Sequence, residues 1–220
     1  MPTIQKPLLI ACDFDGTITR NDTLVRILDQ YGSPSWRKIQ DKVVDGSVSI
    51  REGLQSEMNS VKASPEQLIK VLTEQIDLDP SFQPFFRRMR AQGIPVVVLT
   101  GGFDLCVETV MTRAGLWPVP YLANRLFLNK GTWQVEFPYP SISCSDCGHC
   151  KGDPIRTWTE QGYTTVFAGN GVTDRCGALA AQLTFAKDEL KTWCAGNGVT
   201  AVSFQSFDDI HQELENRQWL

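Results

Sequence analysis

Two aspartates that follow an apolar run constrain this chain most. Residues 8–11 read Leu-Leu-Ile-Ala, a short apolar stretch typical of a parallel strand buried on both faces. Asp13 and Asp15 come shortly after it, on a turn that contains Gly16. Because side chains two positions apart on extended backbone point the same way, both carboxylates face the sheet edge where α/β proteins bind ligands. There one carboxylate can attack while the other moves protons, and a hard cation such as Mg²⁺ can hold both against their mutual repulsion.

The rest of the chain alternates strand and helix patterns. Helical patterns separate most of the apolar strand candidates, which predicts an α/β fold with a Rossmann-like, doubly wound parallel sheet. Alternating apolar residues over 124–139, around Asn129-Lys130-Gly131, predict a β-hairpin. The predicted strands cover residues 8–12, 96–100, 165–169, 182–186 and 201–205, and the predicted helices residues 82–91, 103–114, 154–161 and 208–217.

Residues 22–80 are organised differently. This stretch is polar, contains no strong strand pattern, and shows helical patterns over residues 22–31, 36–44 and 65–76, with another starting in 47–53. We therefore expect a helical domain inserted after the first strand. The predicted core domain then comprises residues 1–21 and 81–220, and the inserted domain residues 22–80.

Three further segments follow the aspartates at predicted strand ends. Residues 96–102 are a strand that ends in a hydroxyl and two glycines, Lys151 follows Cys150, and residues 165–174 run from a strand into a glycine-rich acidic loop. Together with residues 13–19, this order resembles the motifs of haloacid dehalogenase superfamily phosphatases, in their phosphoserine-phosphatase-like branch. The resemblance covers nearly the whole chain, since that branch also has a helical cap and a hairpin.

The resemblance implies a role for each matching residue. Asp13 is the expected nucleophile and Asp15 the expected general acid and base. Thr100, Lys151 and the backbone amide of Gly101 are expected to bind the phosphoryl group. The implied activity is hydrolysis of a phosphomonoester through an aspartyl-phosphate.

The implied cofactor is Mg²⁺, with Asp13, the backbone carbonyl of Asp15, Asn170 and Asp174 as the metal-associated residues. The family usually has Asp at the position of Asn170, so this site lacks one negative charge. Affinity for Mg²⁺ should fall unless Asp174 enters the coordination sphere. Whether Asn170 or Asp174 is the direct ligand stays open.

Short segments of the predicted cap bear on the substrate. Asn21-Asp22 and residues 49–53 look like those of phosphatases that act on 2-hydroxy-3-keto-5-methylthiopentenyl-1-phosphate in methionine salvage. Asp22 and Arg51 are expected to face the substrate, a small phosphorylated metabolite. Arg51 could bind a substrate oxygen, or it could form a surface ion pair with Glu52 or Glu57. The alternatives are a phosphatase for phosphoserine or another small metabolite, and a non-catalytic relative, which the neutral Asn170 would suit.

Composition excludes other partners. Hydrophobic residues make up 42% and charged residues 21% of the 220 residues, with a net charge of -4. The chain has no basic stripe, so nucleic acid and anionic membranes are not expected partners. No apolar run is long enough to span a bilayer, and the first seven residues lack the features of a signal peptide, so we expect a cytoplasmic location. The oligomeric state is left open.

A cysteine-rich loop precedes Lys151. Cys144, Cys147, His149 and Cys150 lie within seven residues, and the chain has seven cysteines, an odd number that cannot all pair. Such a cluster could hold zinc. Structural zinc usually takes two separated ligand pairs, however, and no second Cys-x-x-Cys is present. A metal-free loop is therefore favoured over a zinc site.

Overall fold

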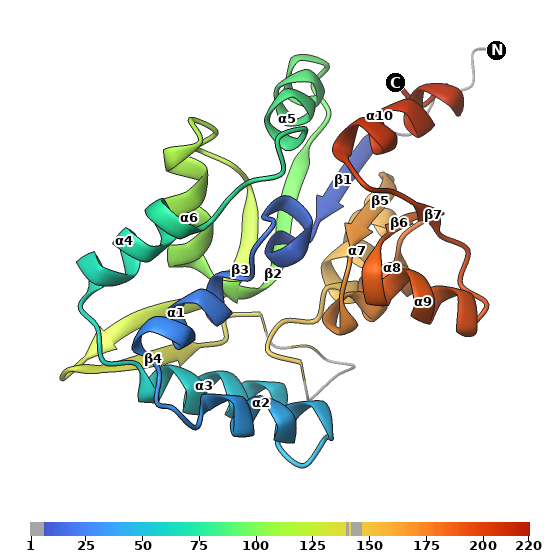
Figure 1. Cartoon of the computed structure of the whole chain (residues 1–220). Helices are drawn as coiled ribbons and strands as arrows, with labels where there is room; N and C mark the ends of the chain where they lie inside the picture. Colours follow the sequence, from blue (N-terminus) through green and yellow to red (C-terminus); the bar gives the residue numbers. More distant parts are fainter. Residues whose placement is uncertain (1–6, 140, 142–146) are drawn as a thin grey trace.

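The computed structural model describes residues 7–139, 141 and 147–220 (Figure 1). Its strands form one seven-stranded sheet in the order β4-β3-β2-β1-β5-β6-β7, in which only β3 and β4 pair antiparallel. The α/β fold class predicted from the sequence is confirmed. The strands are β1 (Leu8–Cys12), β2 (Val96–Phe103), β3 (Tyr121–Asn129), β4 (Thr132–Glu136), β5 (Thr164–Gly169), β6 (Leu183–Ala186) and β7 (Val202–Ser203).

Helices cover both faces of the sheet, as a doubly wound fold requires. Because successive strand residues face opposite sides, Ile10 and Val98 pack on one face and Ala11 and Leu99 on the other. The first face is covered by α5 (Phe82–Ala91), α6 (Asp104–Arg113) and α10 (Phe207–Asn216), and the second by α7 (Gly152–Glu160), α8 (Arg175–Ala180) and α9 (Asp188–Gly196). In the described ranges, no helix combines the length and apolar character that a membrane crossing needs.

The hairpin forms where it was predicted, and it also extends the sheet. Lys130 and Gly131 connect β3 to β4, and both have positive φ, as a tight two-residue turn requires. Strand β3 begins at Tyr121, before the predicted start, and pairs parallel with β2. Two other predicted strands differ in length, since β2 continues to Phe103 and β7 is confined to Val202–Ser203.

Four helices lie between the first strand and α5. They are α1 (Thr23–Tyr31), α2 (Trp36–Val44), α3 (Ile50–Ser60) and α4 (Pro65–Gln75). Ser49 and Ser64 start α3 and α4 with capping boxes, which explains why these helices begin where they do. In Figure 1 this group lies at the carboxyl ends of the strands, with α3 beside β4. We call helices α1–α4 the cap; the boundaries 22–80 and the division into two domains stay a prediction.

Candidate active site

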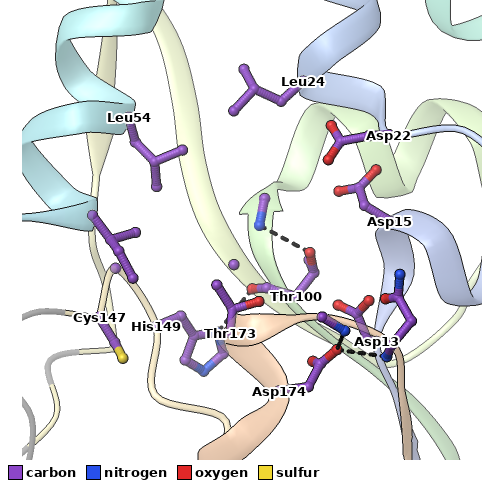
Figure 2. A pocket seen from close by; sticks show the side chains of 16 residues that line it. Asp13, Asp15, Asp22, Leu24, Leu54, Thr100, Cys147, His149, Thr173 and Asp174 are labelled. Carbon is purple, nitrogen blue, oxygen red and sulfur yellow. Dashed lines mark hydrogen bonds between the residues drawn. The ribbon is translucent and has the colours of Figure 1, made fainter. Parts of the chain in front are cut away.

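A cavity of about 260 Å³ opens between the cap and the carboxyl ends of β1, β2 and β5 (Figure 2). Its floor carries the predicted acids, and Figure 2 shows Asp15 and Asp22 side by side, with Asp13 and Asp174 deeper. The cap contributes Leu24, Ile50 and Leu54. The sheet edge thus gathers residues from distant parts of the chain, as parallel strands do.

The turn after β1 directs both aspartates into the cavity. Asp13 N–H donates to the carbonyl of Ala168 at 2.9 Å, which anchors the end of β1 on β5. The wide turn Phe14–Ile18 follows, with Gly16 at φ +78°. A Cβ on Gly16 would lie 2.4 Å from Nδ2 of Asn170, so this position needs glycine for its conformation and for its close neighbour.

Lys151 contacts both Asp13, the candidate nucleophile, and Asp174, in the loop after β5. Its side chain is inaccessible to solvent, and Nζ donates to Asp13 and, at 2.5 Å, to Asp174. The other oxygen of Asp174 accepts from the backbone N–H groups of Asn170 and Gly171 at 2.8 and 2.9 Å. Both oxygens of Asp174 are therefore engaged, and this residue orients Lys151 and the loop after β5.

Burial and neighbouring charges shift the pKa values of these groups. Burial opposes the charged form of Lys151, but Asp13 and Asp174 outweigh it and raise its pKa. Burial and the charge of Asp174 raise the pKa of Asp13, although Lys151 opposes this. Lys151 thus stays charged, and Asp13 lies where additional positive charge would favour its ionised form.

Asp15 is poised to carry a proton. Burial first, and then the charge of Asp22, raises the pKa of Asp15 well above its ordinary value. This happens although Oδ1 of Asp15 accepts from the backbone N–H of Thr23 at 2.7 Å. Asp22 itself caps the start of α1, accepting from Val25 N–H at 2.9 Å. A carboxyl group with a raised pKa beside a second carboxyl group matches the requirements of a general acid next to a nucleophile.

Strand β2 supplies the groups that could bind an anion. Thr100 is buried, and its Oγ1 accepts from the backbone N–H of Gly102 at 2.9 Å. The hydroxyl proton can then be donated into the cavity. Thr100, Gly101 and Gly102 all line the cavity.

Oxygen atoms that could hold a cation come from the first and last motifs. Asp13, Asp15 and Asn170 line the cavity, and Oδ1 of Asn170 accepts from the hydroxyl of Thr17 at 3.1 Å. These are hard oxygen ligands of the type Mg²⁺ prefers. Asp174 is the less available ligand because Lys151 and two backbone N–H groups already use its oxygens.

Arg51, unlike the predicted acids, does not line the cavity. It lies on α3 with its guanidinium 4.7 Å from the ring centroid of Phe137. Among the described residues it forms no ion pair with Glu52 or Glu57. Glu52 instead completes the capping box with Ser49, and Glu57 is buried. The structure thus shows stacking on Phe137 in place of the surface ion pair, and a role of Arg51 in substrate binding stays a prediction.

The cysteine-rich loop contributes residues to the cavity. One of them is His149, which the sequence suggested only as a zinc ligand. Cys147, Gly148 and His149 line the cavity, and His149 is buried. Cys144 lies outside the described residues. Within the described ranges, no three His, Cys, Asp or Glu side chains are grouped as metal ligands. The choice between a zinc site and a metal-free loop stays a prediction.

Comparison with known proteins agrees with this geometry. A sequence model described as haloacid dehalogenase-like hydrolase matches residues 10–179. The chain is 30% identical over 219 residues to the 2-hydroxy-3-keto-5-methylthiopentenyl-1-phosphate phosphatase of Bacillus pumilus (strain SAFR-032), covering 96% of this chain and 92% of that protein.

Two solved structures share the fold. A phospho-aspartyl intermediate analogue of phosphoserine phosphatase gives a TM-score of 0.72 at 22% identity, covering 94% of this chain and 99% of that one. A substrate-bound phosphoserine phosphatase complex gives a TM-score of 0.71 at 22% identity, covering 94% and 98%. At this level of identity, the likeness shows the fold alone.

Proposed function

The chain belongs to the haloacid dehalogenase-like hydrolases and is a phosphatase, and on this premise we propose a Mg²⁺-dependent phosphomonoesterase that works through an aspartyl-phosphate on Asp13. The observation that carries the proposal is the buried Lys151, which contacts both Asp13 and Asp174, beside an Asp15 whose pKa burial raises well above its ordinary value. A non-catalytic binding protein would not need a nucleophile and an acid that line one cavity above a buried, fixed cation.

The proposed reaction assigns a role to each of these residues. The Asp13 carboxylate attacks phosphorus, the bond from phosphorus to the substrate oxygen breaks, and Asp15 gives its proton to the leaving alkoxide. Asp15, now ionised, then takes a proton from water as that water attacks the aspartyl-phosphate, which releases inorganic phosphate and restores Asp13. Lys151, the hydroxyl of Thr100 and the N–H of Gly101 stabilise the charge on the phosphoryl oxygens.

The residues present fit Mg²⁺. Four acids, Asp13, Asp15, Asp22 and Asp174, line the cavity, whereas the described lining contains no Arg or Lys and Lys151 lies buried beneath it. Asp13, the backbone carbonyl of Asp15 and Oδ1 of Asn170 would hold the ion. When bound, Mg²⁺ would supply positive charge that offsets the negative charge of Asp13 and the phosphoryl group.

The lining of the cavity on the cap side is apolar and suits a substrate with an apolar group. Leu24, Ile50 and Leu54 cover the acids, and Arg51 points to the hairpin instead. A substrate carboxylate, such as that of phosphoserine, would lie here without a cationic partner among the described lining residues, which is unfavourable. The lining suits an uncharged group with an apolar end, and this supports 2-hydroxy-3-keto-5-methylthiopentenyl-1-phosphate, an intermediate of methionine salvage, as the substrate.

Parallel assays of the two substrates test the proposal. With Mg²⁺, we expect kcat/KM for 2-hydroxy-3-keto-5-methylthiopentenyl-1-phosphate to exceed that for phosphoserine by about 10²-fold or more, because of the unpaired carboxylate. Asp13→Asn should lower kcat by about 10⁴-fold or more, since an amide cannot form the acyl-phosphate. Asp41→Asn, at an exposed position of α2, is the control and should keep full activity. A preference for phosphoserine would contradict the substrate, and an active Asp13→Asn variant would contradict the mechanism.

A further inference from the structure

Strand β2 leaves the regular ladder where it enters the active site. Leu99 pairs with Leu122, but the next pair joins Phe103 to Asn124, so residues 100–102 lie opposite Ala123 alone. Such a bulge redirects side chains and interrupts the ladder hydrogen bonds. The backbone carbonyls of Thr100 and Gly101 then need other partners, because they lie in a largely buried place.

Two buried side chains bind these consecutive carbonyls. Nδ1 of His149 lies 3.1 Å from the carbonyl oxygen of Thr100, and Nδ2 of Asn124 donates to that of Gly101 at 2.8 Å. A carbonyl oxygen only accepts, so Nδ1 of His149 carries the proton. Burial lowers the pKa of His149 to about 4, and the ring is therefore neutral at physiological pH.

Because the peptide bond is planar, a contact that fixes a carbonyl group also fixes the direction of the N–H group in the same peptide unit. The carbonyl of Thr100 and the N–H of Gly101 belong to one peptide unit and point in opposite directions. When His149 holds the carbonyl, the N–H of Gly101 is turned away from His149. In the same way, Asn124 holds the carbonyl of Gly101, and the N–H of Gly102 is free to donate to Oγ1 of Thr100 at 2.9 Å. That bond makes Oγ1 an acceptor, so its proton is directed elsewhere.

The two side chains are packed as one support. A Cβ on Gly148 would lie 3.2 Å from Nδ2 of Asn124 and 3.1 Å from the Phe137 ring, so glycine lets this loop approach the hairpin closely. The His149 ring stacks on Tyr139 at a centroid distance of 5.0 Å. Oδ1 of Asn124 is buried and has no hydrogen-bond partner among the described residues. The carbonyl of Gly101 can only accept a hydrogen bond, so the nitrogen end of this amide makes the contact.

We propose that Asn124 and His149 are positioning residues for the phosphoryl group. By holding the carbonyls of Gly101 and Thr100, they aim the hydroxyl of Thr100 and the N–H of Gly101 at the phosphoryl oxygens. His149 also ties the loop that carries Lys151 to β2, so the donors from both segments converge. This inference rests on the proposed function, because the ligand of these donors is the phosphoryl group.

Binding of inorganic phosphate, measured by calorimetry with Mg²⁺ present, tests this without depending on turnover. His149→Leu removes the donor, whereas His149→Asn keeps an amide nitrogen near the position of Nδ1. We expect His149→Leu to weaken phosphate binding about five- to tenfold, the effect of one hydrogen bond, and His149→Asn to stay within about twofold of wild type. The matched control is His211→Leu, at the buried histidine of α10, which should change stability without changing phosphate affinity.

Asn124→Leu, of similar shape, should weaken phosphate binding in the same way. If His149→Leu does not fold, the phosphate affinity of Asn124→Leu tests the inference in its place. Equal phosphate affinity in wild type and these Leu variants would overturn the inference. So would an equal loss in His149→Asn and His149→Leu, because that would indicate packing instead of positioning. Failure of the proposed function is separate, since it would show as turnover by Asp13→Asn, whatever the phosphate affinities are.

Discussion

At the scale of single residues, the balance of charge decides what the site can do. Lys151 is shared between Asp13 and Asp174, and burial and the charge of Asp22 raise the pKa of Asp15. In the proposed Mg²⁺ site, the neutral Asn170 would then set how strongly the cation is attracted, since Asp174 already has partners for both oxygens. One substitution at position 170 therefore tests the electrostatics of the whole site.

Asn170→Asp should tighten Mg²⁺ binding. A carboxylate keeps the acceptor that Thr17 uses at 3.1 Å and adds a formal charge beside Asp13. Repulsion between the acids offsets much of the attraction, so the expected net gain is about 1 kcal/mol, or several-fold in affinity. Direct Mg²⁺ titration by calorimetry measures it, with Asp41→Asn as a variant that should leave affinity unchanged. Unchanged or weaker binding by Asn170→Asp would place residue 170 outside the coordination sphere.

Glu57 of α3 should make stability depend on pH. Burial, and then the charge of Asp22, raises its pKa from 4.5 to about 7. The folded state therefore holds this proton more tightly than the unfolded state, so the stabilisation is complete below about pH 4.5 and is lost as the pH rises through about 7. Glu57→Gln should match wild type near pH 4 and exceed it by about 1–2 kcal/mol at pH 8.

Urea unfolding of both proteins across this pH range measures the effect. Glu74→Gln, at an exposed position of α4, is the matched control variant. If the difference between Glu57→Gln and wild type is instead constant from pH 4 to 8, Glu57 has the same pKa in the folded and unfolded states, which would contradict the prediction.

At the scale of elements, the cap is joined to the core through the hairpin. Gln55 of α3 bonds the backbone of β4 at both ends of its amide, with Nε2 3.3 Å from Trp133 O and Oε1 3.0 Å from Val135 N. Trp133 in turn donates from Nε1 to the carbonyl of Ala63 at 3.0 Å. Helix α3 therefore satisfies the outer edge of β4, which would otherwise be unpaired.

Gln55→Leu should loosen this attachment. It keeps the volume of the side chain but leaves two backbone groups of β4 without partners, at a cost of about 1–2 kcal/mol in the free energy of unfolding. Gln40→Leu on the exposed face of α2 is the matched control and should change stability by less than about 0.5 kcal/mol. Chemical denaturation compares them, and equal stability of the two variants would show that water replaces Gln55 on β4 at no cost.

At the scale of the whole molecule, cap and sheet share one hydrophobic core. Leu54, Met58 and Leu72 of the cap belong to the same buried cluster as Ile10 and Val98 of the sheet. Arg113 of α6 also donates to the carbonyls of Thr73 and Ile76, at the end of α4. The cap is therefore packed on the core as part of it, and the two should not unfold separately.

We expect a single thermal transition in which the calorimetric and van't Hoff enthalpies agree. Amide hydrogen exchange gives a local measure, and slowly exchanging amides of α3 and α4 should open with the same free energy as those of β1 and β5. A cap that exchanges at a clearly lower free energy than the sheet would contradict this and would indicate an independent unit.

The sequence by itself determined the parts that depend on short stretches of chain. Helices α2 and α5 begin and end at the predicted residues, and β1 covers the predicted range, because apolar periodicity acts over a few positions. The pairing of Asp13 with Asp15 is equally local, since it follows from alternation at a strand end. The order of the motifs indicated the family, and the resemblance to the family implied which residues form the floor of the cavity.

Only the tertiary structure decided the contacts between distant segments. Position in the sequence did not indicate that Lys151 would form an ion pair with Asp174 or that Arg51 would stack on Phe137. Nor did it indicate that β3 would pair with β2 and so join the sheet. Asn124 and His149 are the clearest case, because each binds a backbone carbonyl more than twenty residues away. Such bonds are available only after the bulge in β2 has removed the ladder partners, and that bulge arises from pairing between strands, which no local pattern specifies.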